Sequence, residues 1–242
     1  MIKRILDILY PRRCILCLSA DPALSRTDID LCPDCRNELQ FVEHSCYQCG
    51  IPLQSTLVGQ LCGQCLQKSP AYDQVISIYH YRQPLVWLIA QMKFNKKRLI
   101  ARLLSQLMTE YLLTIKKTRQ LALPDAIIPV PLHHKRQYQR QFNQSEELAI
   151  TLSDALNIPL DTQYLQRHIN SAQQSGLDAK QRKKNVKGIF KIHNKRQQHY
   201  RHVAIVDDVM STGSTVNEIA RVLKRSGIKQ IDVWVLARAS RP

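Results

Sequence analysis

The sequence has no apolar run that approaches the roughly 18 residues a membrane-spanning helix needs. Residues Met1–Tyr10 are basic and then apolar, but Asp7 interrupts the run and no small-residue cleavage site follows. We therefore expect no secretory signal and no membrane insertion. Acidic residues are scarce: 19 Asp and Glu stand against 35 Lys and Arg, a net charge of +16. The sequence predicts a cytoplasmic protein whose charge favours polyanionic partners such as nucleic acid or phosphorylated ligands.

Cysteine is absent after residue 65, and the eight cysteines before it form four Cys-x-x-Cys pairs. The pairs are Cys14 and Cys17, Cys32 and Cys35, Cys46 and Cys49, and Cys62 and Cys65. Two such pairs supply the four thiolates of a tetrahedral structural zinc site, which leaves no open position for water or substrate. The spacing predicts two structural zinc ions. Disulfides are the competing interpretation, but they need an oxidising compartment that no export signal supports.

The four pairs can combine in more than one way, and a crossed arrangement stays open at this point. Sequential pairing closes the shortest loops and therefore costs slightly less chain entropy. Composition changes near residue 70, where long periodic segments begin. We expect a small zinc-ribbon domain over residues 1–70, stabilised by its metal, and a second domain over residues 71–242.

Hydrophobic periodicity in the second domain alternates between strand and helix. Strands are predicted over residues 74–81, 126–130, 202–206 and 230–237, with a short one within 160–165. Helices are predicted within 84–115, as two segments broken around residues 94–97, and over 145–157 and 216–225. Residues 166–202 are strongly basic and show little periodicity. This alternation predicts an α/β domain with a mainly parallel sheet.

The most informative segment is the strand-to-helix connection after residue 203. An apolar strand runs into Asp207 and Asp208, and a loop of small and hydroxyl residues then leads into a helix. The loop residues are Ser211, Thr212, Gly213, Ser214 and Thr215. Backbone N–H groups at a helix N-terminus form an anion site, and the two carboxylates suit sugar hydroxyls or a hydrated Mg²⁺ ion. The segment therefore predicts a ligand such as a ribose 5-phosphate, with a phosphate close to a cis-diol.

A purely structural interpretation exists for part of this loop, because Thr215-x-x-Glu218 fits a helix capping box. Helix capping does not explain why two carboxylates, Asp207 and Asp208, precede the loop. The motifs of other nucleotide sites are missing: neither a P-loop (G-x-x-x-x-G-K-[ST]) nor a dinucleotide fingerprint (G-x-G-x-x-G) occurs.

The segment resembles the loop that binds phosphoribosyl pyrophosphate (PRPP) in type I phosphoribosyltransferases: apolar strand, Asp-Asp, two residues, Ser-Thr-Gly-Ser-Thr. The whole chain resembles ComF-type proteins, the competence family that includes the GntX-like members. Further matches are Pro129–His133, Arg136, Arg140, Phe142–Gln144, Gln173-Gln174, Arg182, Asn185-Val186, Gly188 and Phe190. One departure is Gln141, where the family usually has Gly before Phe-Asn-Gln. The resemblance implies a type I phosphoribosyltransferase-like fold behind a double zinc ribbon.

The resemblance also implies site residues. The pyrophosphate loop would comprise Val130, Pro131, Leu132 and His133, with Arg136 and Arg140 as anion partners. Mg²⁺ would be held mainly by PRPP oxygens and water. Residues 170–190 match the place and charge of a segment that closes over the site, although a solvated basic loop explains their charge equally well.

No segment specifies a nucleobase, and type I folds include proteins that bind PRPP without turning it over. The resemblance implies a role in the uptake or use of extracellular DNA, with single-stranded DNA bound on a basic surface. Candidates for that surface are Lys93, Lys96, Lys97, Arg98, Lys180, Arg182, Lys183 and Lys184. DNA-uptake, helicase or recombination proteins would be partners. The alternative function is a salvage phosphoribosyltransferase that transfers ribose 5-phosphate from PRPP to a free base.

Overall fold

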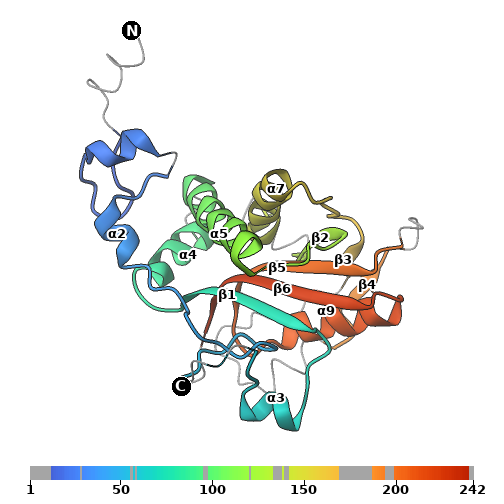
Figure 1. Ribbon diagram of the computed structural model, residues 1–242. Helices are drawn as coiled ribbons and strands as arrows, with labels where there is room; N and C mark the ends of the chain where they lie inside the picture. Colours follow the sequence, from blue (N-terminus) through green and yellow to red (C-terminus); the bar gives the residue numbers. More distant parts are fainter. Residues whose placement is uncertain are drawn as a thin grey trace.

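A computed structural model of the chain describes residues 12–27, 29–54, 57, 59–94, 98–119, 121–132, 138, 142–168, 187–193 and 199–239. Within this part of the chain, no helix is long and apolar enough to span a membrane. A four-stranded parallel sheet lies at the centre, with helices on both faces (Figure 1).

The sheet has the order β1-β6-β5-β2. Its strands are β1 (Gln74–His80), β2 (Ala126–Pro129), β5 (His202–Met210) and β6 (Gln230–Arg238). All three neighbouring pairs are parallel. The predicted parallel sheet is confirmed. Strand β5 continues to Met210, past the predicted end at residue 206, so Asp207 and Asp208 belong to the strand and face different surroundings.

Two apolar clusters hold the helices to the sheet. On one face lie α4 (Leu85–Phe94), α5 (Arg98–Arg119) and α7 (Gln144–Leu156), packed on alternate strand residues such as Val206 and Trp234. On the other face α9 (Ser214–Arg225) packs on the intervening residues, including Ile205 and Val233. This division follows from the alternation of side chains along a strand. The sequence predicts two helices here, and α4 and α5 are two elements; residues 95–97 between them lie outside the described part of the chain.

A second, smaller sheet pairs β3 (Leu165–Arg167) with β4 (Phe190–Ile192) in antiparallel fashion. The expected short strand within 160–165 lies a few residues later in the chain. Strand β4 falls in a region of the sequence that shows little periodicity. A strand of three residues is too short to show alternation, so it could not be predicted. The chain between these strands spans residues 168–189, and most of it lies outside the described residues.

In its described residues, the cysteine-rich segment contains the short helical turns η1 (Pro22–Arg26), α2 (Pro33–Asn37) and α3 (Gly63–Gln67). Between its two halves, the backbone around Phe41 runs antiparallel to β1. The amide of Val42 donates to the carbonyl of Ile78 (2.9 Å), and the amide of His80 donates to the carbonyl of Gln40 (3.0 Å). The segment thereby covers the edge of the sheet, which would otherwise expose unpaired backbone groups.

The first half of this segment also shares a core with the helices. Leu24, Leu31 and Cys35 belong to the same buried cluster as Leu103 of α5. An ion pair between Arg36 and Glu110 joins the same two parts at the surface. The boundary at residue 70 remains a prediction, and the apolar cluster extends across it.

Candidate functional site

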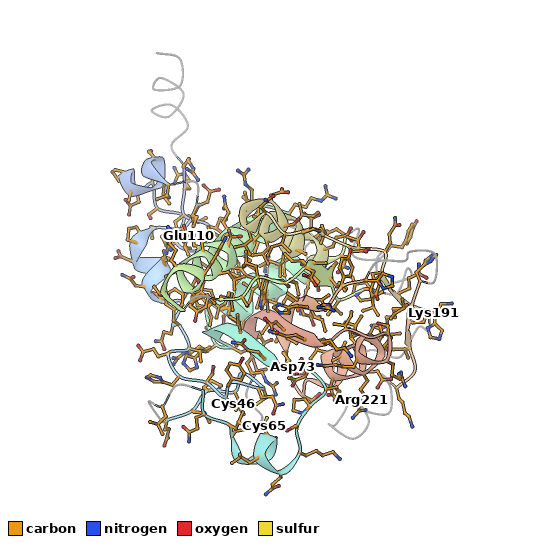
Figure 2. The ribbon with its side chains drawn as sticks, turned by 45° about the vertical axis from the view of Figure 1, so that its right-hand side comes forward. Cys46, Cys65, Asp73, Glu110, Lys191 and Arg221 are labelled. Carbon is orange, nitrogen blue, oxygen red and sulfur yellow. The ribbon has the colours of Figure 1, made fainter. Side chains whose placement is uncertain are left out.

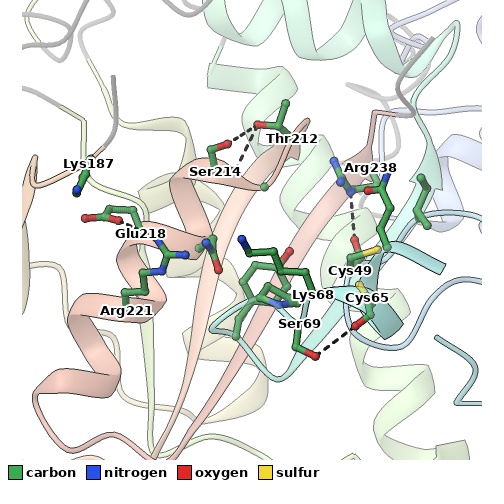
Figure 3. Close-up of a pocket in the computed structure, with 16 residues that line it drawn as sticks. Cys49, Cys65, Lys68, Ser69, Lys187, Thr212, Ser214, Glu218, Arg221 and Arg238 are labelled. Atoms are coloured by element: carbon green, nitrogen blue, oxygen red, sulfur yellow. Dashed lines mark hydrogen bonds and ion pairs between the residues drawn. The ribbon is translucent and has the colours of Figure 1, made fainter. Parts of the chain in front are cut away.

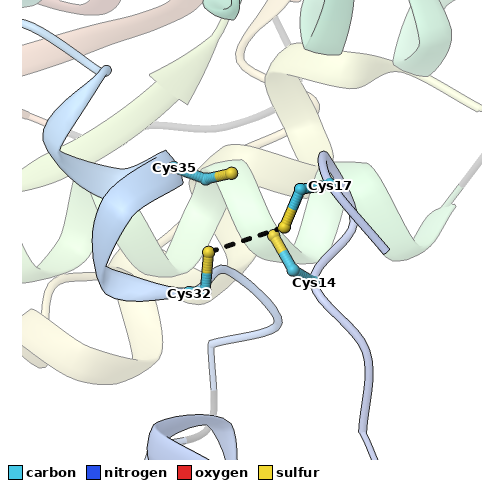
Figure 4. Close-up of side chains that lie close together, drawn as sticks. All are labelled: Cys14, Cys17, Cys32 and Cys35. Atoms are coloured by element: carbon cyan, nitrogen blue, oxygen red, sulfur yellow. Dashed lines mark hydrogen bonds between the residues drawn. The ribbon is translucent and has the colours of Figure 1, made fainter. Parts of the chain in front are cut away.

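The eight cysteines gather into two groups of four. One group is Cys14, Cys17, Cys32 and Cys35, and the other is Cys46, Cys49, Cys62 and Cys65. Figure 4 shows the first group, with its sulfurs directed toward a common centre. The pairing is therefore sequential, which resolves the alternative that the sequence left open. The groups lie apart, and Figure 2 shows Cys46 and Cys65 on the side of the molecule that carries Arg221, away from Glu110.

The donor set of each group fits a structural zinc ion. Within each group the ligand atoms lie within 4.8 Å of one another. The sulfurs of Cys17 and Cys32 are 3.7 Å apart, and those of Cys49 and Cys62 are 3.6 Å apart. Zinc–sulfur bonds of about 2.3 Å in a tetrahedron place sulfurs about 3.8 Å apart. Burial raises the pKa of the Cys35 and Cys65 thiols, so their thiolates need a compensating cation.

The two carboxylates at the end of β5 are held by different partners. The Ser145 hydroxyl at the start of α7 donates to Asp207 Oδ1 (2.8 Å), and the Asp208 amide donates to the same oxygen (3.0 Å). Burial, reinforced by the neighbouring Asp208 charge, raises the pKa of Asp207 to about 7. Asp208 is 5% exposed, and its Oδ1 accepts a hydrogen bond from the Val209 amide (2.7 Å).

Lys93 lies beside these carboxylates. Its Nζ is 2.7 Å from Asp208 Oδ2, and the two side chains are 21% and 7% exposed. The sequence suggested Lys93 as a nucleic-acid contact, and the structure places it against the Asp pair at the end of α4. Its ammonium group offsets part of the negative charge there and lowers the pKa of Asp207 against the effect of burial.

The loop after β5 turns into α9, and the first helical amide, that of Ser214, donates to Thr212 Oγ1 (3.3 Å). Gly213 is the N-cap residue with φ of +73°, a left-handed conformation that favours glycine. No side chain caps the helix at that residue. The Thr212 and Ser214 hydroxyls lie 2.8 Å apart. These groups and the N-terminus of α9 lie where the sequence predicts an anion site, and that site remains a prediction.

The capping-box interpretation of the loop is wrong. The helix begins at Ser214, so Thr215 lies inside the first turn and is not the N-cap residue. The Glu218 carboxylate accepts a hydrogen bond from the Gly188 amide (2.9 Å), next to β4. Glu218 therefore ties α9 to the small antiparallel sheet.

The predicted pyrophosphate loop leaves β2 beside β5. The Val130 amide donates to Val206 O (2.9 Å), and the Asn143 side-chain amide donates to the Val130 carbonyl (3.1 Å). A cavity of about 450 Å³ lies between Pro131, Leu132 and the small sheet. Arg167 of β3 lines it and is 8% exposed. Of the predicted loop residues, His133, Arg136 and Arg140 lie outside the described residues.

Most of the expected nucleic-acid contacts also fall outside the described part of the chain. These residues are Lys96, Lys97, Lys180, Arg182, Lys183 and Lys184. Arg98 is described: its side chain is 72% exposed and lies 3.9 Å from Glu147 and over the Phe142 ring.

Family models match two parts of the chain. A double zinc ribbon domain matches residues 5–66, and a phosphoribosyl transferase domain matches residues 143–242. Competence protein F of Haemophilus influenzae is 42% identical over 210 residues, covering 86% of this chain and 90% of that protein. The chain belongs to the competence protein F family. The fold class that the sequence predicted is confirmed.

Two further relatives extend this family. DNA utilization protein YhgH of Escherichia coli K12 is 39% identical over 208 residues, covering 86% of this chain and 90% of that protein. Competence protein ComFC of Bacillus subtilis is 27% identical over 214 residues, covering 84% of this chain and 82% of that protein.

Sequence reasoning did not predict that Ser145, Lys93 and Arg167 lie beside the predicted site residues. Ser145 lies at the start of a helix, where serine is common for capping reasons alone. Its position in the sequence therefore gives no sign of a contact with Asp207. Lys93 was grouped with the basic cluster that follows it, and no local pattern distinguishes it from that cluster. Arg167 lies in a three-residue strand that periodicity does not reveal. Each becomes visible only through contacts between distant parts of the chain.

Proposed function

We propose that this chain is a cytoplasmic factor for the uptake or use of DNA, which binds PRPP and single-stranded DNA. The names of its relatives, competence protein F and DNA utilization protein, support the cellular role. The observation that carries the proposal is the juxtaposition of Asp207 and Asp208 with the loop Ser211–Thr215 at the end of one strand.

Each chemical group of PRPP matches one part of this arrangement of carboxylates and loop. Its 5-phosphate would accept hydrogen bonds from the loop amides and from the Thr212 and Ser214 hydroxyls. Its ribose hydroxyls would donate to Asp207 and Asp208. Its pyrophosphate would lie along Val130–Leu132, with Mg²⁺ held by PRPP oxygens and water. Arg167, which lines the cavity beside that loop, is a described cation on the pyrophosphate side.

Lys93 gives the apo site an internal counter-ion. Two adjacent carboxylates and an incoming polyphosphate repel one another, and the Lys93 ammonium group reduces that repulsion. It lies 2.7 Å from Asp208, so a diol that binds Asp208 has to share or displace it. We therefore propose that Lys93 takes part in PRPP binding by reducing this repulsion.

Single-stranded DNA would bind elsewhere than on the Asp pair. DNA lacks the 2′-hydroxyl and so cannot present the cis-diol that suits Asp207 and Asp208. The +16 charge favours DNA phosphates, and the expected contacts are Arg98 and the basic residues in 96–97 and 180–184. DNA-uptake, helicase or recombination proteins are the proposed partners.

Titration tests both bindings. Purified protein is titrated with PRPP·Mg²⁺ by calorimetry, and with single- and double-stranded DNA at two salt concentrations. We expect saturable PRPP binding and a preference for single strands, with a log–log salt slope of about −0.7 per neutralised phosphate. Absence of both bindings would contradict the proposal. Stoichiometric pyrophosphate release with a free base, without DNA affinity, would favour the salvage transferase.

A further inference from the structure

The second half of the zinc ribbon forms one wall of a cavity of about 530 Å³. The opposite wall is the loop Ser211–Thr215, here called the phosphate loop, and the exposed side of α9. Figure 3 shows Cys49, Cys65 and Lys68 on one side, and Thr212, Ser214 and Arg221 on the other. This volume falls in the range of small-molecule sites, about 300–1,000 Å³. The cavity is separate from the Asp pair but adjoins the same loop.

The wall is fixed in place by buried contacts. Arg238, which is 7% exposed, donates from Nε to the Cys49 carbonyl (3.1 Å) and from Nη1 to the Met210 carbonyl (2.9 Å). The Ala71 amide donates to the Asn217 side chain on α9 (2.7 Å). The ribbon, the end of β5 and α9 are thus joined around the cavity. A preformed site loses less freedom when it binds a ligand.

The lining combines an apolar surface with a cationic rim. Ile51, Pro70 and Tyr72 contribute apolar atoms, and Lys68, Lys187 and Arg221 contribute exposed cations. Among the described lining residues the one carboxylate is Glu218, which accepts from the Gly188 amide and lies 3.7 Å from Arg221. The charge of the cavity is therefore positive. A nucleotide suits such a lining, with its base on the apolar surface and its phosphate at the rim.

We propose that this cavity holds one nucleotide of single-stranded DNA, with the base against the second zinc-ribbon wall and the phosphate between Lys68 and Arg221. The inference rests on the proposed function and deepens it, since it assigns the base-contacting surface that no sequence motif specified. It also gives the zinc ribbon a direct part in binding, because the Cys49 and Cys65 segments form the wall.

The test uses fluorescence anisotropy of a fluorescein-labelled oligodeoxythymidylate with the full zinc-loaded chain. The cavity variant carries Lys68→Glu and Arg221→Glu. The control carries Lys116→Glu and Lys117→Glu at exposed positions of α5, on the other face of the sheet, with the same change in net charge. We expect at least a tenfold loss of affinity in the cavity variant and less than a threefold loss in the control. Zinc content and melting temperature, measured in both variants, report folding.

Photo-crosslinking provides a second readout that needs no substitution. An oligonucleotide that contains 5-iododeoxyuridine should crosslink within residues 64–72 or 212–221, as mapped by mass spectrometry. Equal losses in the two variants, or crosslinks confined to other segments, would overturn the inference while leaving DNA binding by the chain intact. A wild-type chain that binds no oligonucleotide would refute the DNA part of the proposed function itself, and the inference with it.

Discussion

Asp207 and Asp208 are adjacent in the chain but differ in their partners. Asp208 pairs with Lys93, whereas Asp207 accepts hydrogen bonds from the Ser145 hydroxyl and from a backbone amide. Strand geometry is the cause, since successive side chains of β5 point to opposite faces. The pair therefore offers acceptors in two directions.

The raised pKa of Asp207 makes stability depend on pH. Because its folded pKa, about 7, lies above the unfolded value of about 3.9, the folded chain retains a proton that the unfolded chain releases. This contribution is complete below about pH 4 and is lost as the pH rises through about 7. Asp207→Asn keeps the Oδ1 acceptor and does not titrate. We expect the variant to gain at least ~1 kcal/mol in free energy of unfolding relative to wild type between pH 4 and pH 8.

Urea denaturation of both proteins across that pH range measures this difference. Asp154→Asn, an exposed change on α7, serves as the control and should show no such trend. A pH-independent difference between Asp207→Asn and wild type would contradict the environment described for Asp207.

Lys93 is expected to stabilise the apo protein through its ion pair. Lys93→Met leaves the buried Asp208 carboxylate without its cation, which should cost about 1–3 kcal/mol. Arg98→Met is the matched control: Arg98 is 72% exposed and 3.9 Å from its partner, so its loss should cost less than about 0.5 kcal/mol. Denaturant unfolding measures both. Equal costs would show that the Lys93 pair contributes no more than a surface contact.

At the scale of the elements, strand β5, the phosphate loop and α9 act as one unit. The strand carries the carboxylates, Gly213 turns the backbone, and α9 begins at Ser214. The second half of the ribbon packs against the same unit. There Gly50 has a φ of +69°, and an added Cβ would lie 2.6 Å from Val75 Cγ1 on β1.

Gly50→Ala should therefore destabilise the docking of the second zinc site on the sheet. We expect a loss of about 1–3 kcal/mol in free energy of unfolding, since strain at a positive φ adds to the clash. Gly59→Ala separates the two effects, because Gly59 also has a positive φ (+78°) but no atom within 4 Å of the added Cβ. Chemical denaturation of the two variants is the measurement. A cost at Gly59 as large as that at Gly50 would show that the contact with Val75 is unimportant.

The long elements and the phosphate loop could be predicted from sequence because their signals are local. Buried strands and amphipathic helices repeat over many residues, and the segment from Asp207 to Thr215 is contiguous. The contacts of Lys93, Ser145 and Arg167 could not be predicted, since each depends on how distant segments pack. The cavity beside the ribbon could not be predicted for the same reason. It arises where residues near 50, 68 and 221 converge.

At the scale of the whole molecule, the zinc ribbon completes the fold. Its linker covers the edge of β1, and its first half shares a core with α5. We expect metal analysis to give close to two zinc ions per chain. Removal of zinc by a chelator should lower the melting temperature of the entire chain, because the helices and the sheet lose their packing partner.

Calorimetric melting with and without the chelator, with zinc added back, measures this coupling. A near-zero zinc content in folded protein purified under reducing conditions would contradict two structural sites. A melting transition of the sheet that does not shift when zinc is removed would show that residues 71–242 are stable without the ribbon.

We propose that Asp207, Asp208 and the loop after them bind PRPP. Calorimetric titration of PRPP·Mg²⁺ into wild type and into the Asp207→Ala, Asp208→Ala double variant tests it most directly, with zinc content and melting temperature as folding controls. Hydrogen bonds to charged acceptors contribute about 1.5–3 kcal/mol each. We expect saturable binding by wild type and at least a hundredfold loss of affinity in the variant. Unchanged affinity in a folded variant would contradict it.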